Sequence, residues 1–306
     1  MGNNNPLVTV AVVTYNSSWF VEATLNSIAS QTYKNIELLI SDDSSKDDTV
    51  AICEKWVNEN GSRFVRCKII KSPINTGVSA NINRAIDNAE GDWFKGIAGD
   101  DLLLPNCVED YVRFVENTPE ANIVFSNYYK KIEPNEDLIL NNYEENVLDF
   151  YDLDASEQFK ILLYRCIPNA PTSFMSRNLL RKHKYNELYK YMEDIPMWVN
   201  LTKAGEKLHY LNKPTVVYRV HETISNSNKI FNSIRFTETC NLYSYLESLR
   251  YCREYNLPDA YDTIRKDIFL RDISFALFGN KKTFFTKYLY AIIGKLVRKF
   301  CRFKME

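Results

Sequence analysis

Strand-like and helix-like segments alternate at short intervals through the first part of this 306-residue chain. The first segment, Leu7–Val13, is a continuous apolar run rich in valine, which is typical of a strand buried on both faces. Four further strand-like runs follow, each preceded by a segment with helical spacing of apolar residues. They are Ile36–Ile40, Lys68–Ile70, Trp93–Ile97 and Ile123–Tyr129. Repeated βα units of this length predict an α/β fold with a mostly parallel central sheet flanked by helices.

The second half of the chain carries a weaker alternation. Asn135–Asp154 is acidic and rich in Asn and Asp, and we expect it to form a loop or insertion. Short strands are expected at Ala170–Met175, Leu208–Leu211 and Thr215–Val220. After a polar stretch at 226–232 that is typical of a linker, the apolar spacing is helical from about residue 233 to the end.

Several common catalytic motifs are missing from the sequence. There is no GxGxxG, HExxH or GxSxG, which argues against a dinucleotide-binding domain, a zincin and an α/β-hydrolase. Gly91 and Gly96 have the spacing of a phosphate-binding loop, but Ile97 stands where that loop needs Lys. The 38 basic and 39 acidic residues give a net charge of -1, so composition gives no reason to expect a nucleic-acid partner.

Polar side chains follow each of the first four strands, where parallel strands present their carboxyl ends at one edge of the sheet. They are Thr14, Tyr15 and Asn16 after the first strand, Asp42 and Asp43 after the second, Asn75 and Gly77 after the third, and Asp100 and Asp101 after the fourth. Such carboxylates can hold a divalent cation or accept hydrogen bonds from a base and a ribose. For any one segment, turn and helix-cap chemistry is the alternative interpretation.

The order and spacing of these segments resemble the opening of the inverting glycosyltransferases of family 2. The likeness rests on Thr14-Tyr15-Asn16, a later Gln-Thr-Tyr, the Asp42-Asp43-Ser44 signature, Asn75-Thr76-Gly77 and Gly99-Asp100-Asp101 followed by Pro105, and it covers roughly residues 6–130. The resemblance implies a GT-A fold. It also implies metal-dependent, inverting transfer of a sugar from a nucleotide-diphosphate donor to a hydroxyl of a glycan or lipid-linked acceptor, in surface-polysaccharide synthesis.

On this basis we expect a GT-A catalytic domain over residues 1–228 and a helical C-terminal extension over 229–306. The nucleotide-sugar half of the catalytic domain would span about 6–130, and the acceptor half about 131–228.

The resemblance also assigns expected functions to the polar residues of the first half. Asp100 would bind Mn²⁺ or Mg²⁺, with Asp101 as the other candidate ligand; Ala98 stands where the family often has a further Asp. Asp42 would hydrogen-bond the base. A carboxylate acceptor suits the N3–H of uracil or thymine, which favours a UDP or dTDP donor over a purine nucleotide, and we expect a UDP-sugar. The other expected donor-binding residues are Thr14, Tyr15, Asn16, Asp43, Asn75, Gly77 and Arg219.

The acceptor half carries a second acidic motif, Glu193-Asp194, which resembles the family's Glu-Asp pair at a helix start. Inversion needs one carboxylate to take the proton of the attacking hydroxyl, and we expect Asp194 to be that base with Glu193 beside it. The alternative interpretation is that these two residues only cap the helix and place negative charge in its first turn. Arg219 and His221 lie in a segment that resembles the family's Tyr-Arg-x-His. Arg219 would pair with phosphate, and His221 would complete the metal shell or contact the diphosphate, with a purely structural histidine as the alternative.

The C-terminal tail combines apolar and basic residues at helical spacing. Leu289, Ile292 and Leu296 lie on one face, and Lys295 and Arg298 lie on the other. Such a helix over 281–304 favours association with the inner-membrane surface, with packing on the core as the alternative. The sequence shows no signal peptide and no run long enough to span a bilayer, which predicts a cytoplasmic protein at that membrane face.

Two other functions fit parts of the pattern. A nucleotidyltransferase that makes activated sugars also needs a carboxylate-bound metal on an α/β sheet. It usually has a glycine-rich basic loop after the first strand, and residues 14–20 contain neither Gly nor Lys. A non-catalytic scaffold with a GT-A-like fold is supported only by Ala98 in the metal-binding segment.

Overall fold

The computed structural model describes residues 5–132, 137–141, 145–221 and 234–278, with scattered positions between 285 and 296. Contacts divide the chain into two compact units. The first unit comprises Met1–Gln158 and Ile167–Val220, and the second comprises Phe159–Cys166 and His221–Glu306.

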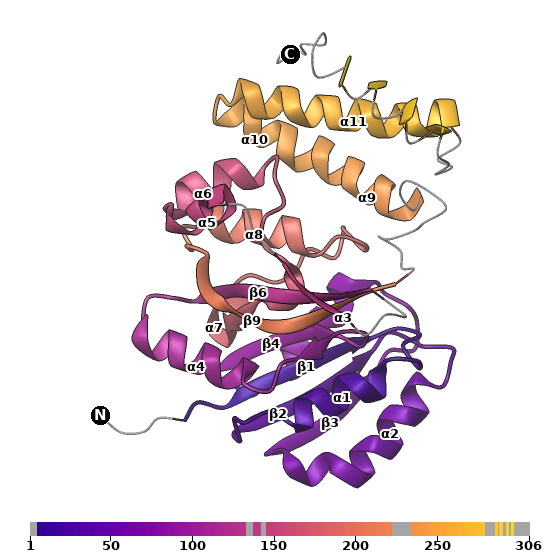
Figure 1. Ribbon diagram of the computed structural model, residues 1–306, viewed down its shortest axis with the longest axis vertical. Coiled ribbons are helices and arrows are strands. Elements are labelled where there is room, and N and C mark those ends of the chain that lie inside the picture. The colour runs from indigo at the N-terminus through magenta and orange to yellow at the C-terminus, as the bar shows by residue number, and fades with distance from the viewer. Residues whose placement is uncertain are drawn as a thin grey trace. The chain divides into compact units, whose positions relative to one another are not determined.

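Four parallel strands form one half of the sheet in the first unit (Figure 1). In spatial order they are β3 (Arg66–Lys71), β2 (Ile36–Asp42), β1 (Val8–Thr14) and β4 (Trp93–Ala98). Side chains on both faces of β1 are buried, with only Val13 partly exposed, which explains its unbroken apolar run. This half confirms the predicted parallel sheet.

The other half of the sheet is mixed. It contains β8 (Phe174–Ser176), β6 (Ile123–Ile132), β9 (His209–Val220) and β5 (Leu102–Leu103), and β7 (Leu138–Leu140) pairs with β6. β8 joins the halves by pairing antiparallel with both β4 and β6. β9 runs parallel to β6, and β5 pairs antiparallel with β9.

The two strands predicted at 208–211 and 215–220 are one strand, β9, with an irregular register. Ser126 of β6 pairs with Leu211, whereas the next residue, Asn127, pairs with Pro214. Two residues before Pro214 are skipped in the pairing. Pro214 itself has no N–H that could donate a hydrogen bond to the neighbouring strand. The proline therefore interrupts the sequence pattern without ending the strand.

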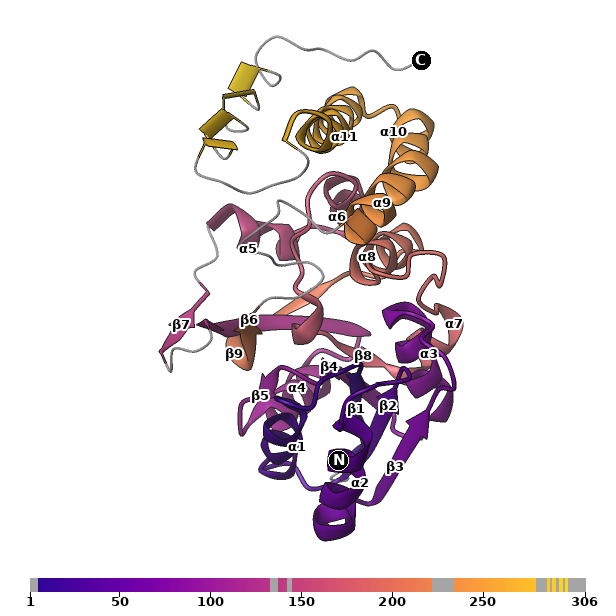
Figure 2. The ribbon, with the colours of Figure 1, turned by 90° about the vertical axis from the view of Figure 1, so that its right-hand side faces the viewer.

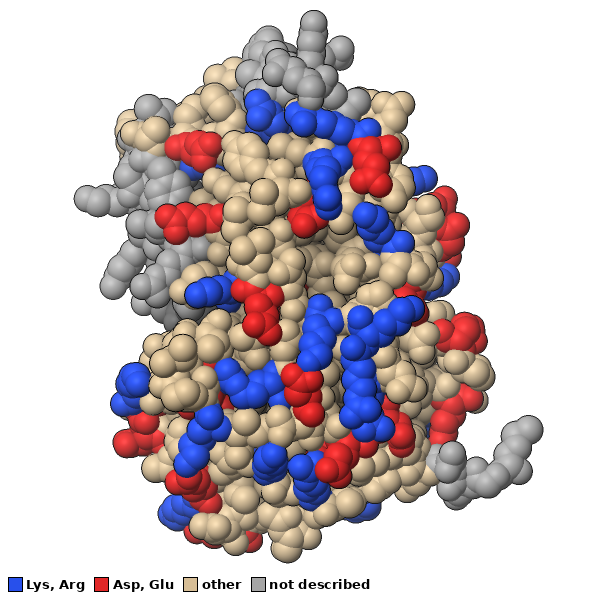
Figure 3. All heavy atoms as spheres, turned by 180° about the vertical axis from the view of Figure 1, so that it is seen from behind, with Lys and Arg blue, Asp and Glu red and all other residues tan. Residues whose placement is uncertain are grey.

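Helices follow the parallel strands in the predicted order. They are α1 (Val21–Ala29), α2 (Thr49–Asn60), α3 (Val78–Asn88) and α4 (Cys107–Asn117). α3 packs against β1 and β2, and α1 packs against α2 and β5. Basic and acidic side chains are interspersed over the face drawn in Figure 3, in keeping with the near-zero net charge.

The prediction of a loop at 135–154 is wrong in part. The described residues of this segment include the strand β7 and the helix α5 (Glu145–Asp152). Phe150 and Tyr151 of α5 are buried, and Tyr151 stacks on Tyr210 with ring centroids 4.7 Å apart. Burial of these rings stabilises a helix in a sequence whose acidic residues suggest a loop. The strand predicted at 170–175 is likewise shorter, because a 3₁₀ turn occupies Ala170–Thr172 and β8 begins at Phe174.

Further helices complete both units. The first unit adds α7 (Arg177–Lys182) and α8 (Asp194–Lys203), and α6 (Ala155–Leu162) spans the division between the units. The second unit contains α9 (Ile234–Tyr243), a π-helical segment (Ser244–Ser248), α10 (Leu249–Glu254) and α11 (Pro258–Phe278). α10 packs against α11 (Figure 2).

The helical pattern expected from residue 233 is confirmed over 234–278. The predicted linker at 226–232 and most of the predicted 281–304 helix lie outside the described residues. None of the helices in the described part of the chain is both long and apolar enough to cross a membrane.

Candidate active site

The ends of β1, β2 and β4 meet at one edge of the sheet. Thr14 is paired with Asp42 in the ladder, and its hydroxyl donates to the Asp42 carboxylate at 2.9 Å. The Asp43 amide donates to the Thr14 carbonyl at 3.0 Å. On the other side of β1, the Gly99 amide donates to the Val13 carbonyl at 3.0 Å, which brings the Asp100 segment to the same edge.

Asp42 is a fixed carboxylate rather than a mobile surface charge. Its side chain is 2% exposed, and it accepts hydrogen bonds from the hydroxyls of Thr14 at 2.9 Å and Ser45 at 2.5 Å. The Ser45 amide donates to its second oxygen at 2.9 Å. These three donors hold the carboxylate in one orientation, and a carboxylate has about four acceptor positions, so it can take a further donor.

The loop after β1 is fastened to the loop after β2. Asn16 has φ 52°, a left-handed conformation that Asn tolerates better than most residues. Its amide donates to the Ser45 hydroxyl at 2.9 Å, and its side-chain oxygen accepts from the Lys46 amide at 2.8 Å. Tyr15, which lies between Thr14 and Asn16 in the chain, is 44% exposed. An aromatic ring on a fixed loop beside Asp42 can stack on a nucleobase.

Asp43 has mainly internal partners. Its carboxylate accepts the amides of Thr76 at 2.9 Å and Gly77 at 2.8 Å, and the Thr76 hydroxyl at 2.6 Å. It thereby ties the end of β2 to the start of α3, where a negative charge is favourable. Gly77 has φ +94°, and a Cβ there would lie 3.0 Å from Lys190 atoms, so this position requires glycine. Asn75 before it is exposed.

Asp100 and Asp101 differ sharply in environment. Asp100 is half-buried, whereas Asp101 is 1% exposed and accepts the Arg219 amide at 2.9 Å. Burial, with the nearby Asp100 charge, raises the pKa of Asp101 to about 8. Arg219 donates from Nε to the Asp100 carbonyl and from Nη2 to the Thr24 hydroxyl at 3.0 Å. Arg219, expected to pair with phosphate, thus also braces the Asp100–Asp101 turn.

Lys95 is a charged residue of this region that the sequence analysis missed. It lies on β4, is fully inaccessible to solvent, and donates from Nζ to the Pro171 and Gly96 carbonyls. Burial lowers the pKa of Lys95 to about 8, against the opposing effect of Asp101. Its only signal in the sequence is a lysine inside the otherwise apolar strand Trp93–Ala98.

Glu193 and Asp194 lie at the beginning of α8, as predicted. Glu193 is the N-cap residue, and the Asp194 carboxylate accepts the Ile195 amide at 2.8 Å. Burial raises the pKa of both carboxyls, and the charge of Asp194 raises that of Glu193 further. A pair of like charges that share a low-dielectric site titrates as a unit, with one proton retained to higher pH.

α3 holds the loop that leads to this acidic pair. The Asn83 side chain donates to the Tyr185 carbonyl at 2.9 Å and accepts the Tyr185 amide at 3.0 Å. The Ser79 hydroxyl donates to the Tyr189 carbonyl at 2.9 Å, and the Val78 amide donates to the Lys190 carbonyl at 3.2 Å. Because Asp43 fixes the start of the same helix, the strand-end residues and the Glu193–Asp194 loop share one rigid support.

We expect Asn83→Ala to destabilise the protein and to lower turnover. The variant leaves the buried N–H and C=O of Tyr185 without partners, at a cost of about 1–3 kcal/mol for each unsatisfied group. Urea denaturation and steady-state kinetics measure the two effects. Asn117→Ala is the matched control, since exposed Asn117 bonds only within its own helix and should change stability by less than about 0.5 kcal/mol. Equal losses in both variants would contradict the supporting function of Asn83.

The residues at this edge fit a divalent ion that is shared with a phosphate ligand. Among the residues that the structure describes, no three His, Cys, Asp or Glu side chains are grouped as a metal cage. Mg²⁺ sites on phosphate substrates need only one or two carboxylates, because phosphate oxygens and water complete the shell. The half-buried Asp100 meets that requirement. His221 is the first residue of the second unit, and its contact with a metal stays a prediction.

A family model described as Glycosyl transferase family 2 matches residues 9–182, more than half of the chain. The chain belongs to glycosyl transferase family 2. The matched range contains every strand-end residue described above. The Glu193–Asp194 pair and Arg219 lie beyond it.

Curated relatives of this family 2 glycosyltransferase are moderately similar. An uncharacterized glycosyltransferase of Haemophilus influenzae is 29% identical over 231 residues, which are 73% of this chain and 68% of the relative. The UDP-Glc:alpha-D-GlcNAc-diphosphoundecaprenol beta-1,3-glucosyltransferase WfaP of Escherichia coli is 28% identical over 229 residues, 75% of this chain and 83% of WfaP.

Solved structures share the fold of this family 2 enzyme. Residues 1–349 of Staphylococcus aureus TarS in complex with UDP-GlcNAc match with a TM-score of 0.57 and 20% identity, over 89% of this chain and 73% of that one. The chain spans only 44% of the longer TarS structure. Mannosyltransferase PcManGT from Pyrobaculum calidifontis, in complex with GDP-Man and Mn²⁺, matches with a TM-score of 0.55 and 17% identity, over 96% and 81%. The predicted GT-A fold is confirmed.

Proposed function

We propose that this family 2 glycosyltransferase is a metal-dependent inverting enzyme that uses a UDP-sugar. Its acceptor would be a hydroxyl of a glycan or lipid-linked glycan in surface-polysaccharide synthesis. One observation carries the proposal: Thr14, Asp42 and the Asp100 turn meet at one sheet edge, and α3 connects that edge to the Glu193–Asp194 loop.

The fixed Asp42 carboxylate supports binding of a uracil base. Its three donors leave room for one more, and the N3–H of uracil is a donor of the right kind. The exposed Tyr15 ring on the adjoining loop would stack on the base. UDP-sugars are also named for two similar proteins, UDP-GlcNAc with TarS and UDP-Glc with WfaP.

Asp100 would hold Mn²⁺ or Mg²⁺ against the donor diphosphate, with Asp101 and Arg219 bracing the turn. When bound, the ion supplies Lewis-acid stabilisation of the negative charge that builds on the leaving diphosphate. The chemistry of the donor set supports this assignment, and Mn²⁺ accompanies the donor in the similar mannosyltransferase structure.

Asp194 would act as the general base in a single displacement. The acceptor oxygen attacks the anomeric carbon from the side opposite the diphosphate, and the bond from that carbon to the diphosphate oxygen breaks. The acceptor proton moves to Asp194, and the nucleoside diphosphate leaves with the bonding electron pair. A raised pKa makes the ionised Asp194 a stronger base, and the Ile195 amide fixes its orientation.

We expect kcat/KM to rise with pH as the Glu193–Asp194 pair loses its shared proton, because the base acts only when ionised. Burial and the charge of Asp194 raise the pKa of Glu193, so the pair keeps one proton to higher pH than a lone carboxyl would. Glu193→Gln removes the carboxyl that shares this proton, so the rise in kcat/KM moves to lower pH. A pH–rate profile from about pH 5 to about pH 9 compares the two enzymes. An unchanged or upward-shifted profile in Glu193→Gln would contradict the pairing.

Stability should change in the opposite sense over the same range. The pKa of Glu193 is raised from 4.5 to about 8 in the folded chain, so the folded state binds more protons between these values. The free energy of unfolding therefore falls as pH rises from 4.5 to about 8, and Glu193→Gln should reduce that slope.

A lipid-linked acceptor would bring the enzyme to the cytoplasmic face of the membrane. WfaP is named for an acceptor of this class. The basic and apolar sequence of 281–304 supports peripheral attachment there.

The reaction class can be tested by product analysis with purified protein, Mn²⁺ and a panel of nucleotide sugars. Transfer predicts release of UDP that increases when a lipid-linked or glycan acceptor is added. Pyrophosphate release from a sugar phosphate and a nucleoside triphosphate would instead identify a nucleotidyltransferase. Inversion is read from the anomeric configuration of the product.

A further inference from the structure

Trp19 is an almost fully exposed aromatic residue that the proposed transferase chemistry does not use. It lies in the loop between β1 and α1 and is 92% exposed. The chain has three other tryptophans, which are buried or partly buried: Trp56, Trp93 and Trp198. Burial of so large a ring normally stabilises a fold, which is why tryptophan is a highly buried residue type on average. Packing of the core therefore gives no reason for a tryptophan at position 19.

The backbone on both sides of Trp19 is held in place. Before it, the Ser18 amide donates to the Asp47 carboxylate at 3.1 Å. After it, the Phe20 amide donates to the Ser17 carbonyl at 2.9 Å. An exposed ring on a fixed backbone has only its two side-chain torsions left to lose, so contact with a ligand costs little conformational entropy.

The loop that carries Trp19 also contacts the candidate active site. Arg219, which braces the Asp100–Asp101 turn, donates from Nη2 to the Phe20 carbonyl at 3.2 Å. The guanidinium carbon of Arg219 lies 4.9 Å from the centre of the Phe20 ring. At the other end of the loop, Asn16 is hydrogen-bonded to the loop after β2. Trp19 therefore belongs to the sheet edge that carries the proposed donor site.

The exposed charges near Trp19 are mostly negative. Glu22 lies in the first turn of α1, and Asp47 and Asp48 lie in the facing loop after β2. Lys46 is the one basic residue of the sequence 43–48. Three carboxylates against one ammonium group disfavour an anionic lipid surface, which attracts basic segments. They suit an uncharged ligand with hydroxyl groups, because carboxylates accept hydrogen bonds from hydroxyls.

A sugar ring meets both requirements. The C–H groups on the face of a pyranose carry partial positive charge and pack on the negative face of an aromatic ring, while its hydroxyls donate to carboxylates. We propose that Trp19 binds a neutral sugar residue of the acceptor glycan. The proposal rests on the proposed function, in which the acceptor is a glycan, and it adds a contact that determines which acceptor is preferred.

Binding can be measured on the full chain without donor or metal. Trp19 is the most exposed tryptophan, so a sugar that covers its ring changes the intrinsic fluorescence of the protein. Cellobiose and N,N′-diacetylchitobiose are the probes, because their β-linked rings have equatorial substituents and flat C–H faces. We expect a saturable fluorescence change at about millimolar concentrations in the wild type and none in Trp19→Phe.

Calorimetry with the same sugars compares affinities, since it does not depend on the tryptophan signal. Trp19→Ala should bind at least about tenfold more weakly, because truncation of an aromatic contact residue removes most of its binding energy. Trp19→Phe keeps a smaller aromatic face and should bind about threefold more weakly. Thermal unfolding checks that the variants stay folded.

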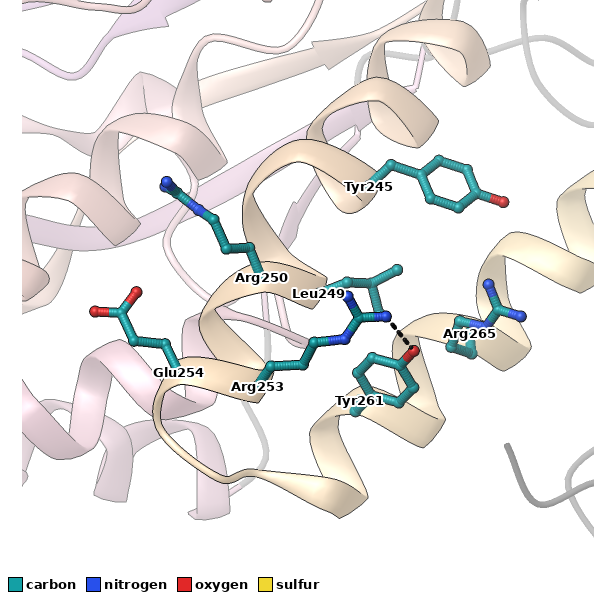
Figure 4. A pocket seen from close by; sticks show the side chains of 7 residues that line it. All are labelled: Tyr245, Leu249, Arg250, Arg253, Glu254, Tyr261 and Arg265. Atoms are coloured by element: carbon teal, nitrogen blue, oxygen red, sulfur yellow. Dashed lines mark hydrogen bonds between the residues drawn. The ribbon is translucent and has the colours of Figure 1, made fainter. Parts of the chain in front are cut away.

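Transfer kinetics separate an acceptor contact from a structural function. With the acceptor that increases UDP release, Trp19→Ala should raise the KM for that acceptor by at least about tenfold. We expect kcat and the KM for the nucleotide sugar to change by less than about twofold. Tyr245→Ala is the matched control, because Tyr245 is a 50% exposed aromatic residue that lines a hollow of the second unit (Figure 4). It should leave all three constants unchanged.

Failure of this proposal can be distinguished from failure of the proposed function. If the wild type binds neither sugar, or if Trp19→Ala binds both as tightly as the wild type, the sugar contact is overturned even where transfer is measured. If both sugars bind at Trp19 but no nucleotide sugar is turned over, the contact stands and the proposed function fails. A fluorescence change with phosphatidylcholine–phosphatidylglycerol vesicles, but with neither sugar, would identify a membrane contact and overturn the proposal.

Discussion

Asp194→Asn is expected to lower kcat by about 10³-fold while the protein stays folded, since general-base catalysis contributes about 10²–10⁴-fold. Asn keeps the shape of the side chain and can still accept the Ile195 amide, but it cannot take a proton. The variant also removes one of two neighbouring negative charges. Its melting temperature at about pH 8 should therefore equal or exceed that of the wild type.

Steady-state transfer rates and thermal unfolding measure the two effects on the same protein. Asp149→Asn is the matched control, because Asp149 is an exposed aspartate on α5 that should tolerate the same change. Wild-type turnover in Asp194→Asn would mean that another group takes the proton. If Glu193→Gln were instead the inactive variant, the base would be Glu193.

Asp100→Asn should have a comparable effect through a different step. An amide is a much weaker ligand for Mn²⁺ or Mg²⁺ than a carboxylate, and loss of the ion removes several kcal/mol of stabilisation from the leaving diphosphate. We expect turnover to fall by about 10³-fold or more, and the apparent affinity for Mn²⁺ to weaken with it.

The choice between Asp100 and Asp101 as the ligand can be read from metal titrations of activity. Asp101 is buried and accepts the Arg219 amide, and Asn keeps that acceptor while removing a charge that burial disfavours. Asp101→Asn should therefore leave stability unchanged or higher, and lower Mn²⁺ affinity less than Asp100→Asn does. Asp137→Asn, at an exposed position, is the control. The reverse order of Mn²⁺ affinities would identify Asp101 as the ligand.

The parallel half of the fold could be predicted because its central strands are buried on both faces and therefore have continuous apolar runs. β8 has 3 residues and β5 has 2, too few to show any periodicity. Their positions depend on distant partners; Leu102 of β5, for example, pairs with Val217 of β9. Such pairings are decided by tertiary packing rather than by local pattern.

The candidate site shows the same division. The carboxyl ends of parallel strands must meet, so Thr14, Asp42 and Asp100 could be grouped from their positions in the sequence. The internal partners of Asp43 could not, because its carboxylate binds amides 33 and 34 positions away. Arg219 reaches the Asp100 turn across 119 positions, and nothing in the local sequence indicates that contact.

The proposed chemistry requires the sheet edge to bind a nucleoside diphosphate through a divalent ion at Asp100. Calorimetric titration of UDP into the wild-type protein, with Mn²⁺ and then with a chelator, tests it most directly. We expect binding that requires Mn²⁺, is stronger for UDP than for GDP, and disappears in Asp100→Asn. Absence of nucleotide binding in the presence of Mn²⁺, or equal binding of UDP with the chelator and in Asp100→Asn, would contradict it.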